Sequence, residues 1–257
     1  EYVEAIRDRG TEIVGGRDFF DYLSLAAEMP KEEVVRRMAT PPQGLIQRVV
    51  EGRLCKVDYS GFPSEKEYAG HVAALADASI PKIKALHAGR NSDEALTIVL
   101  ERGREWPAAT DGKTVHLNLD HFDKIAEVYG GREADDGAIV HEIDHAVLGA
   151  PRYDQSTAWL IEGVADYVRD KLGFQRESKG AFQGSTPHFE EDVQTSYQAT
   201  AHFLMHLEKT RPTVVKDLVK ALLDETYSEK MFEKLFGKPL TELVKLHRRE
   251  EKSKTGH

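Results

Sequence analysis

The sequence predicts an α+β protein, with a small sheet near the middle of the chain and a mostly helical C-terminal half. Two stretches carry the strand prediction. Residues 95–101 (ALTIVLE) are rich in β-branched side chains, and residues 113–119 (KTVHLNL) alternate between polar and apolar. A shorter run at 54–59 is a third candidate strand, and Asp111-Gly112 predicts the turn before residues 113–119. Beyond residue 120, helical patterns follow one another between glycine and proline breaks.

The first 53 residues form a separate helical pattern. Apolar residues recur there at helical spacing, and Pro30 and the pair Pro41-Pro42 interrupt them. We therefore predict a helical N-terminal extension or subdomain over 1–53 and a main domain over 54–257. The main domain opens, after the strand at 54–59, with a long helix over 64–87, where Ser64 and Glu67 have the spacing of a capping box.

The composition is typical of a globular chain and argues against several classes of partner. Of 257 residues, 40% are apolar and 31% are charged, which is enough to bury a sizeable core. The net charge of −9 shows no basic face for nucleic acid, and no apolar run approaches the roughly 20 residues of a membrane span. The single cysteine, Cys55, excludes an intrachain disulfide and leaves the compartment open. Because the chain begins at Glu1 rather than methionine, we expect that a preceding segment has been removed. No pattern predicts an oligomeric state.

Residues 138–149 (AIVHEIDHAVLG) predict an apolar helix that ends at Gly149. His141 and His145 are four residues apart, so their imidazoles lie on one face and can bind one metal ion. Glu142 stands beside the first histidine, where its carboxylate can reach a water molecule on that metal. This is the HExxH pattern of zinc peptidases. A chance match has a probability of roughly 5% in such a chain, but its place in an apolar helix favours function, because buried His and Glu need partners.

A second helix, predicted over residues 156–173, offers a third ligand. Catalytic zinc usually takes three protein ligands. Glu162 and Asp166 are four residues apart, and a short loop allows this helix to pack antiparallel to the HExxH helix. Glu162 would then complete the ligand set, and Asp166 would accept a hydrogen bond from the outer N–H of a ligand histidine. The alternative is an exposed acidic face, with Arg169 and Lys171 nearby.

The remaining histidines and the residues before the second strand receive structural interpretations. A second metal site is not expected at His202 and His206, since no acidic residue lies between them and no third ligand is apparent. We expect packing or structural roles, rather than roles in a cleft, for Trp106, Pro107, His116 and His121.

Together, these motifs resemble those of the basic secretory protein family of plant and bacterial peptidases. The resemblance rests on HEIDH (141–145), WLIEGVADYVRDKLGF (159–174), SYQATAHFL (196–204) and YSEKMFEKLFGKPLTEL (227–243), and it covers roughly residues 55–250. More broadly, the chain is similar to gluzincins, in which a glutamate on a second helix is the third zinc ligand and an acidic residue one turn later supports a histidine. This chain is acidic, unlike the members that named the family, and its residues 1–53 and the loop at 149–158 are unmatched.

The resemblance implies a zincin-like fold, in which an edge strand of a small sheet lies over the HExxH helix and pairs with extended substrate. We assign residues 113–119 to that strand. It further implies one Zn²⁺ per chain, a peptide or protein substrate, and export to the periplasm or the exterior. Tyr197, in a matching block, is the candidate donor to the oxyanion, with a core aromatic as the alternative.

The predicted function is therefore a zinc-dependent peptidase in which Glu142 activates a zinc-bound water. An endopeptidase is favoured, although no residue pattern distinguishes internal from terminal cleavage. One alternative is a catalytically silent zincin-fold protein that acts as a binding module, although the intact Glu142 argues against it. Another alternative is a helical binding module without a metal, in which the HExxH pattern is accidental.

Overall fold

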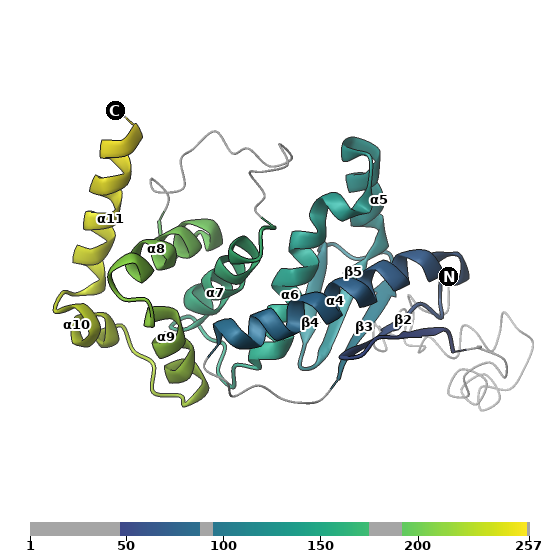
Figure 1. Ribbon diagram of the computed structural model, residues 1–257, viewed down its shortest axis with the longest axis horizontal. Coiled ribbons are helices and arrows are strands. Elements are labelled where there is room, and N and C mark those ends of the chain that lie inside the picture. Colours follow the sequence, from purple (N-terminus) through teal and green to yellow (C-terminus); the bar gives the residue numbers. More distant parts are fainter. Residues whose placement is uncertain (1–46, 88–94, 175–191, 256–257) are drawn as a thin grey trace, which may run out of the picture. The chain divides into compact units, whose positions relative to one another are not determined.

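The structure is a computed structural model that describes residues 47–87, 95–174 and 192–255 (Figure 1). Arg48–His257 form one compact unit. The predicted helical extension lies, up to residue 46, outside the described residues, so the division of the chain at residue 53 stays a prediction. Within the described ranges, no helix combines the length and apolar character that crossing a membrane requires.

The described part of the chain contains a mixed five-stranded sheet, and the fold is α+β as predicted. The strand order is β1-β2-β3-β5-β4, and the strands are β1 (Val49–Glu51), β2 (Cys55–Asp58), β3 (Leu96–Glu101), β4 (Ala108–Asp111) and β5 (Thr114–Asn118). The inner pairs β2/β3 and β3/β5 are parallel, whereas β1 and β4 add antiparallel edges. The strands predicted at 54–59, 95–101 and 113–119 correspond to β2, β3 and β5.

Two predictions were wrong at the edges of the sheet. Residues Val49–Glu51, predicted as helix, form β1, because pairing with β2 and the β-branched pair Val49-Val50 outweigh the local periodicity. Residues 113–119 are not an edge strand. The turn at Asp111-Gly112, where Gly112 has a φ of 58°, joins β5 to β4 as a hairpin, so β4 takes the edge. The short β4 sequence AATD has too little β-branched content to be recognised.

Helices make up most of the rest of the described chain. They are η1 (Pro63–Glu65, 3₁₀), α4 (Lys66–Leu86), α5 (Leu119–Tyr129), η2 (Arg132–Asp135, 3₁₀), α6 (Asp136–Leu148), α7 (Ala158–Lys171), α8 (Tyr197–Thr210), α9 (Val214–Leu223), α10 (Lys230–Phe236) and α11 (Leu240–Thr255). The predicted capping box of Ser64 and Glu67 is not formed. The 3₁₀ turn that begins at Pro63 shifts the start of α4 to Lys66, and no side chain caps it.

The core lies between the sheet and helices α4 and α6, which pack against each other and against the strands (Figure 1). Along β3, Leu96, Ile98 and Leu100 are buried while the residues between them are partly exposed, as expected for a sheet with one covered face. From α6, Ile139 and Ile143 enter the same core. The HExxH helix is therefore anchored on its apolar side by the sheet, which leaves its histidine face for α7.

Helix α8 approaches α7 closely at Gly163. A Cβ atom at this position would lie 2.0 Å from Cγ2 of Thr200, so only glycine allows the observed packing. Because Gly163 follows Glu162 directly, this contact also brings the start of α8 beside the predicted ligand.

Candidate metal and catalytic centre

Three side chains from α6 and α7 meet at one point. Nε2 of His141 lies 3.0 Å from Nε2 of His145. Oε2 of Glu162 lies 3.1 Å from the first of these nitrogens and 3.4 Å from the second. His141 and Glu162 are buried and His145 is nearly so. The structure thus brings together the three residues that the sequence predicted as metal ligands.

The geometry and chemistry of this triangle fit a zinc ion. Tetrahedral ligands at zinc bond lengths of about 2.0–2.1 Å stand roughly 3.3 Å apart, close to the observed separations. Two imidazole nitrogens and one carboxylate oxygen also form a common donor set for catalytic zinc. Since Nδ1 of His141 faces Asp166, its Nε2 lone pair points at the other two ligand atoms. Lone pairs that converge in this way repel one another unless a proton or a metal ion lies between them.

The pKa values of His141 and Glu162 are both shifted in the direction that favours the charged form. Burial disfavours the imidazolium of His141, but the carboxylates of Asp166 and Glu162 outweigh it and raise the pKa of His141 to about 9. Burial likewise opposes ionisation of Glu162, yet hydrogen bonds with His141 and His145 hold its pKa well below the ordinary range. A proton on His141 and a metal ion are thus alternative ways of neutralising this centre.

Asp166 lies behind the first histidine. Its Oδ1 is 2.7 Å from Nδ1 of His141 and also 2.7 Å from Nη1 of Arg169. The guanidinium of Arg169 is 1% exposed and also lies 3.3 Å from Asp170. The sequence placed Arg169 on a possible exposed face; its spacing of three residues from Asp166 was the available signal for a buried pair.

Glu142 contacts Thr110, a residue that no sequence pattern predicted to lie at the centre. The hydroxyl of Thr110, on β4, lies 2.8 Å from Oε2 of Glu142 and 2.9 Å from its backbone oxygen, and can donate to one of them at a time. A strand residue therefore orients the carboxylate next to the metal-ligand triangle. Only the pairing of β4 beside α6 creates this contact, so no local pattern could have revealed it.

Two tyrosines also reach the centre. Tyr197, the first residue of α8, is 49% exposed and its ring stacks on His141, with centroids 6.2 Å apart, which excludes the core-aromatic alternative. Partial burial and the nearby carboxylates raise the pKa of Tyr197, so its hydroxyl stays protonated at neutral pH. Tyr153, in the loop that the sequence could not match, donates a hydrogen bond of 2.7 Å to Oε1 of Glu162.

The centre lies in a cavity of about 720 Å³. Its walls come from β4 and the segment before it, from α6, from the loop that joins α6 to α7, and from the facing ends of α7 and α8. The lining residues include Trp106, Pro107, Ala108, Ala109, Thr110, Leu148, Tyr153, Ile161 and Tyr197, together with the ligand residues. Trp106 and Pro107 therefore line the cavity, although packing roles were expected.

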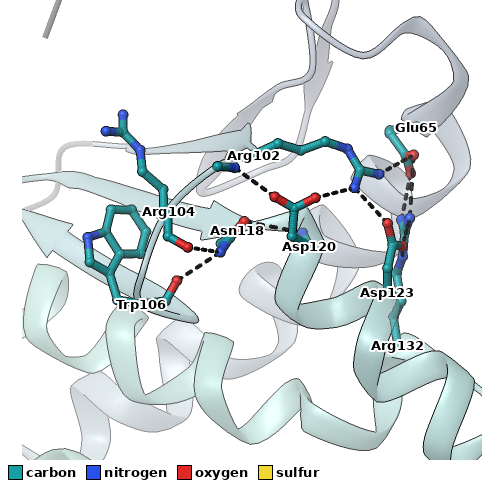
Figure 2. A network of polar contacts seen from close by, with 9 residues as sticks. Glu65, Arg102, Arg104, Trp106, Asn118, Asp120, Asp123 and Arg132 are labelled. Atoms are coloured by element: carbon teal, nitrogen blue, oxygen red, sulfur yellow. Dashed lines mark hydrogen bonds and ion pairs between the residues drawn. The ribbon is translucent and has the colours of Figure 1, made fainter. Parts of the chain in front are cut away.

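A polar network anchors the segment that carries Trp106 (Figure 2). The side-chain amide of Asn118 donates to the backbone oxygens of Arg104 and Trp106, at 2.9 and 3.1 Å. Asp120 accepts from the side chain of Arg102 and from the backbone N–H of Gly103, each at 2.7 Å. The chain between β3 and β4 is thereby tied to the start of α5, which sets the position of one cavity wall.

The network continues through Arg102, which also contacts Asp123 at 2.7 Å, and through Arg132, which joins Asp123 to Glu65 (Figure 2). His116 and His121 are not cavity-lining residues. His116 contacts Glu101 at 2.6 Å, and its ring lies nearly perpendicular to that of Trp106, with centroids 6.4 Å apart. His121 contacts Asp135 at 2.7 Å.

Comparison with protein families supports the resemblance noted from the sequence. The model of a family described as peptidases of plants and bacteria matches residues 71–246, well over half of the chain. A comparison with curated proteins and one with solved structures each gave no match. The matched region contains α6, α7 and the whole triangle of His141, His145 and Glu162. The chain therefore belongs to the basic secretory protein family, the peptidases of plants and bacteria.

Proposed function

We propose that the protein is a zinc-dependent endopeptidase with a zincin-like arrangement, and that His141, His145 and Glu162 hold one zinc ion. The proposal rests chiefly on one observation. Three ligand atoms converge at separations of 3.0–3.4 Å beside a carboxylate, inside a cavity lined by an edge strand. The family to which the chain belongs supports the reaction class.

A zinc ion bound here would supply Lewis acidity, which acidifies a water molecule and polarises the scissile carbonyl. Glu142 takes the proton from the attacking water and passes it to the leaving amine. Thr110 keeps the Glu142 carboxylate aimed at that position. The Tyr197 hydroxyl, protonated and at the rim of the centre, donates to the developing oxyanion.

The other polar residues position the ligands. Asp166 fixes the tautomer and the ring orientation of His141. Tyr153 donates a hydrogen bond to Oε1 of Glu162, so Oε2 would be the oxygen open to a metal ion. Both contacts are made by side chains of the protein itself, and each fixes the orientation of a predicted ligand.

The edge strand β4 supports the binding of an extended peptide. Among the described strands, β4 pairs only with β5, and its residues Ala108, Ala109 and Thr110 line the cavity. An extended substrate can add to this edge through backbone hydrogen bonds. A strand edge accepts a chain that continues beyond both of its ends, which favours internal cleavage. Export, which the resemblance to basic secretory proteins implies, stays a prediction.

The substitution Glu142→Gln tests the proposal. The variant should lose about 10²–10⁴-fold in kcat/KM, because the proton acceptor is removed. Its zinc content should match that of the parent, because no ligand changes. The measurement is cleavage of a denatured protein and a diverse peptide library, alongside zinc per chain. The matched control is Glu127→Gln, an exposed helix glutamate of α5, which should cleave at the parent rate.

The outcomes separate the alternatives. Parent-like hydrolysis by the Glu142→Gln variant would show that another group is the base. Zinc binding without any cleavage by the parent would favour the silent binding module. A parent that binds no zinc, and whose cleavage a chelator leaves unchanged, would remove the metal from the proposal.

A further inference from the structure

Helix α11 packs against α8 (Figure 1). A second cluster of side chains that could bind a metal lies between these two helices, and none of its residues lines the cavity. It consists of His206 on α8 with His247 and Glu251 on α11, and the candidate ligand atoms lie within 4.8 Å of one another. We propose that these residues form a second transition-metal site, of the kind that zinc occupies, which links the C-terminal helix to α8. This inference does not depend on the proposed peptidase function.

His247 occupies a position where an apolar residue would be expected. On α11 the buried residues Leu240 and Leu243 begin the inward face, and His247 continues it at helical spacing with 2% exposure. In the described part of the chain, neither ring nitrogen of His247 has a hydrogen-bond partner. Buried polar side chains are nearly always hydrogen-bonded. An imidazole buried with both nitrogens open therefore points to a ligand.

The neighbours of His247 supply the remaining donors. The ring of His206 lies 4.8 Å away between centroids. Glu251 follows His247 by four residues and so lies on the same face of α11, as His145 follows His141 on α6. Two imidazoles and one carboxylate suit zinc or a similar transition metal, whereas calcium and magnesium prefer oxygen ligands alone.

Two further contacts describe the surroundings of the cluster. Nδ1 of His206 lies 3.4 Å from Oε2 of Glu250, so a second carboxylate stands next to the proposed ligands. The ring of Phe203 packs beside that of His247, with centroids 5.8 Å apart. A purely structural interpretation makes His247 an aromatic filler between Phe203 and His206. That interpretation leaves both ring nitrogens of His247 without a hydrogen-bond partner, whereas a metal ion would bind one of them.

The sequence alone did not reveal this site. His202 and His206 share a helix, but the cluster uses only His206 and takes its other members from a helix some forty residues away. Since α8 begins at Tyr197 beside the first centre, an ion at His206 would hold α11 on the helix that forms part of the cavity wall.

The test counts zinc in the full-length chain. The protein is stripped with chelator, reloaded with zinc, freed of excess metal, and analysed for zinc per chain. His247→Leu, which fills the same space without a donor, should carry one zinc fewer than the parent. His202→Ala, which removes a histidine of α8 outside the cluster, should carry as many as the parent. Because the readout is a difference, it holds whether or not the first centre binds zinc.

A second measurement guards against misfolding of the leucine variant. Glu251→Gln, at a partly exposed position, should weaken zinc binding at this site by at least about 10-fold, judged against the 10–100-fold cost of losing an outer-sphere partner. In a His145→Ala background, zinc should still raise the Tm, and adding Glu251→Gln should reduce that rise. Equal zinc content in the parent and in folded His247→Leu, or an undiminished rise in Tm with Glu251→Gln, would overturn the proposal.

Discussion

The hydroxyl of Thr110 and the carboxylate of Glu142 form a contact between a strand and a helix at the centre. We expect Thr110→Val, which keeps the shape and removes the donor, to lower kcat by about 10-fold, since misplaced catalytic groups cost up to about 10². KM and zinc content should stay near parent values. Thr110→Ser should restore the rate because it restores the hydroxyl. A rate that falls equally in the serine and valine variants would assign Thr110 a packing role only.

The contact between Asp166 and His141 belongs to the same scale. Asp166→Asn should weaken zinc binding about 10–100-fold, because the outer hydrogen bond to a ligand histidine loses its charge. Asp170→Asn is the matched control. Asp170 also contacts Arg169, and burial raises its pKa, yet it has no contact with the ligands. Zinc affinity measured by chelator competition should fall for the first variant alone; an equal fall in both would indicate general loosening of α7.

Single residues also show which parts of the site could be predicted from the sequence. His141, Glu142 and His145 were recognisable because their spacing is local to one helix. Thr110 and Tyr153 were not, because Thr110 acts on a helix from a strand and Tyr153 lies in an unmatched loop. Arg169 pairs with Asp166 within α7, and only the structure shows that this pair is buried. Tyr197 was found by resemblance, and its contact with His141 became visible only in the structure.

Among the elements, the pairing of α7 with α8 depends on Gly163. Its replacement by alanine would place Cβ 2.0 Å from Thr200, so the helices must separate. We expect Gly163→Ala to lower the free energy of unfolding by about 1–3 kcal/mol, as for other overpacked interiors. Chemical denaturation measures this change.

The control at the same scale is Gly70→Ala in α4, where a Cβ would meet nothing within 4 Å. That change should stabilise the protein by roughly 0.5–1 kcal/mol, since alanine is the better helix former. If Gly163→Ala were as well tolerated as Gly70→Ala, the close helix contact would not exist in solution.

The edge strand illustrates the limit of prediction at this scale. The turn at Asp111-Gly112 was predicted, yet the strand before it was not, so the wrong strand was placed at the edge. A four-residue strand has little pattern of its own, and its identity comes from the partner across the turn.

For the whole molecule, one buried thiol predicts how stability depends on pH. Burial, with the carboxylates of Asp77 and Glu51, raises the pKa of Cys55 from 9.0 to about 12. Above pH 9 the unfolded chain ionises this thiol and the folded chain does not. Its contribution to stability is therefore complete below pH 9 and is lost as pH rises towards 12, by at most about 1.4 kcal/mol per pH unit.

Denaturant unfolding between pH 8 and 11 checks this expectation against Cys55→Ala. The parent should lose stability faster than the variant above pH 9, whatever the offset between them at pH 8. Parallel curves for the two proteins would contradict the buried, protonated thiol.

The sequence by itself determined the α+β class, the two helices that carry the predicted ligand residues, and the spacing of those residues within each helix. These features are local: a helix places residues four apart on one face whatever surrounds it. The apolar character around HEIDH was enough to predict that the motif would be buried.

Only the tertiary structure decided which strand borders the cavity, which hydroxyl orients Glu142, and which histidines gather between α8 and α11. Each of these depends on side chains from elements far apart in sequence. Their meeting is set by the packing of a shared core, where helix approach at a glycine or pairing across a turn outweighs local preference.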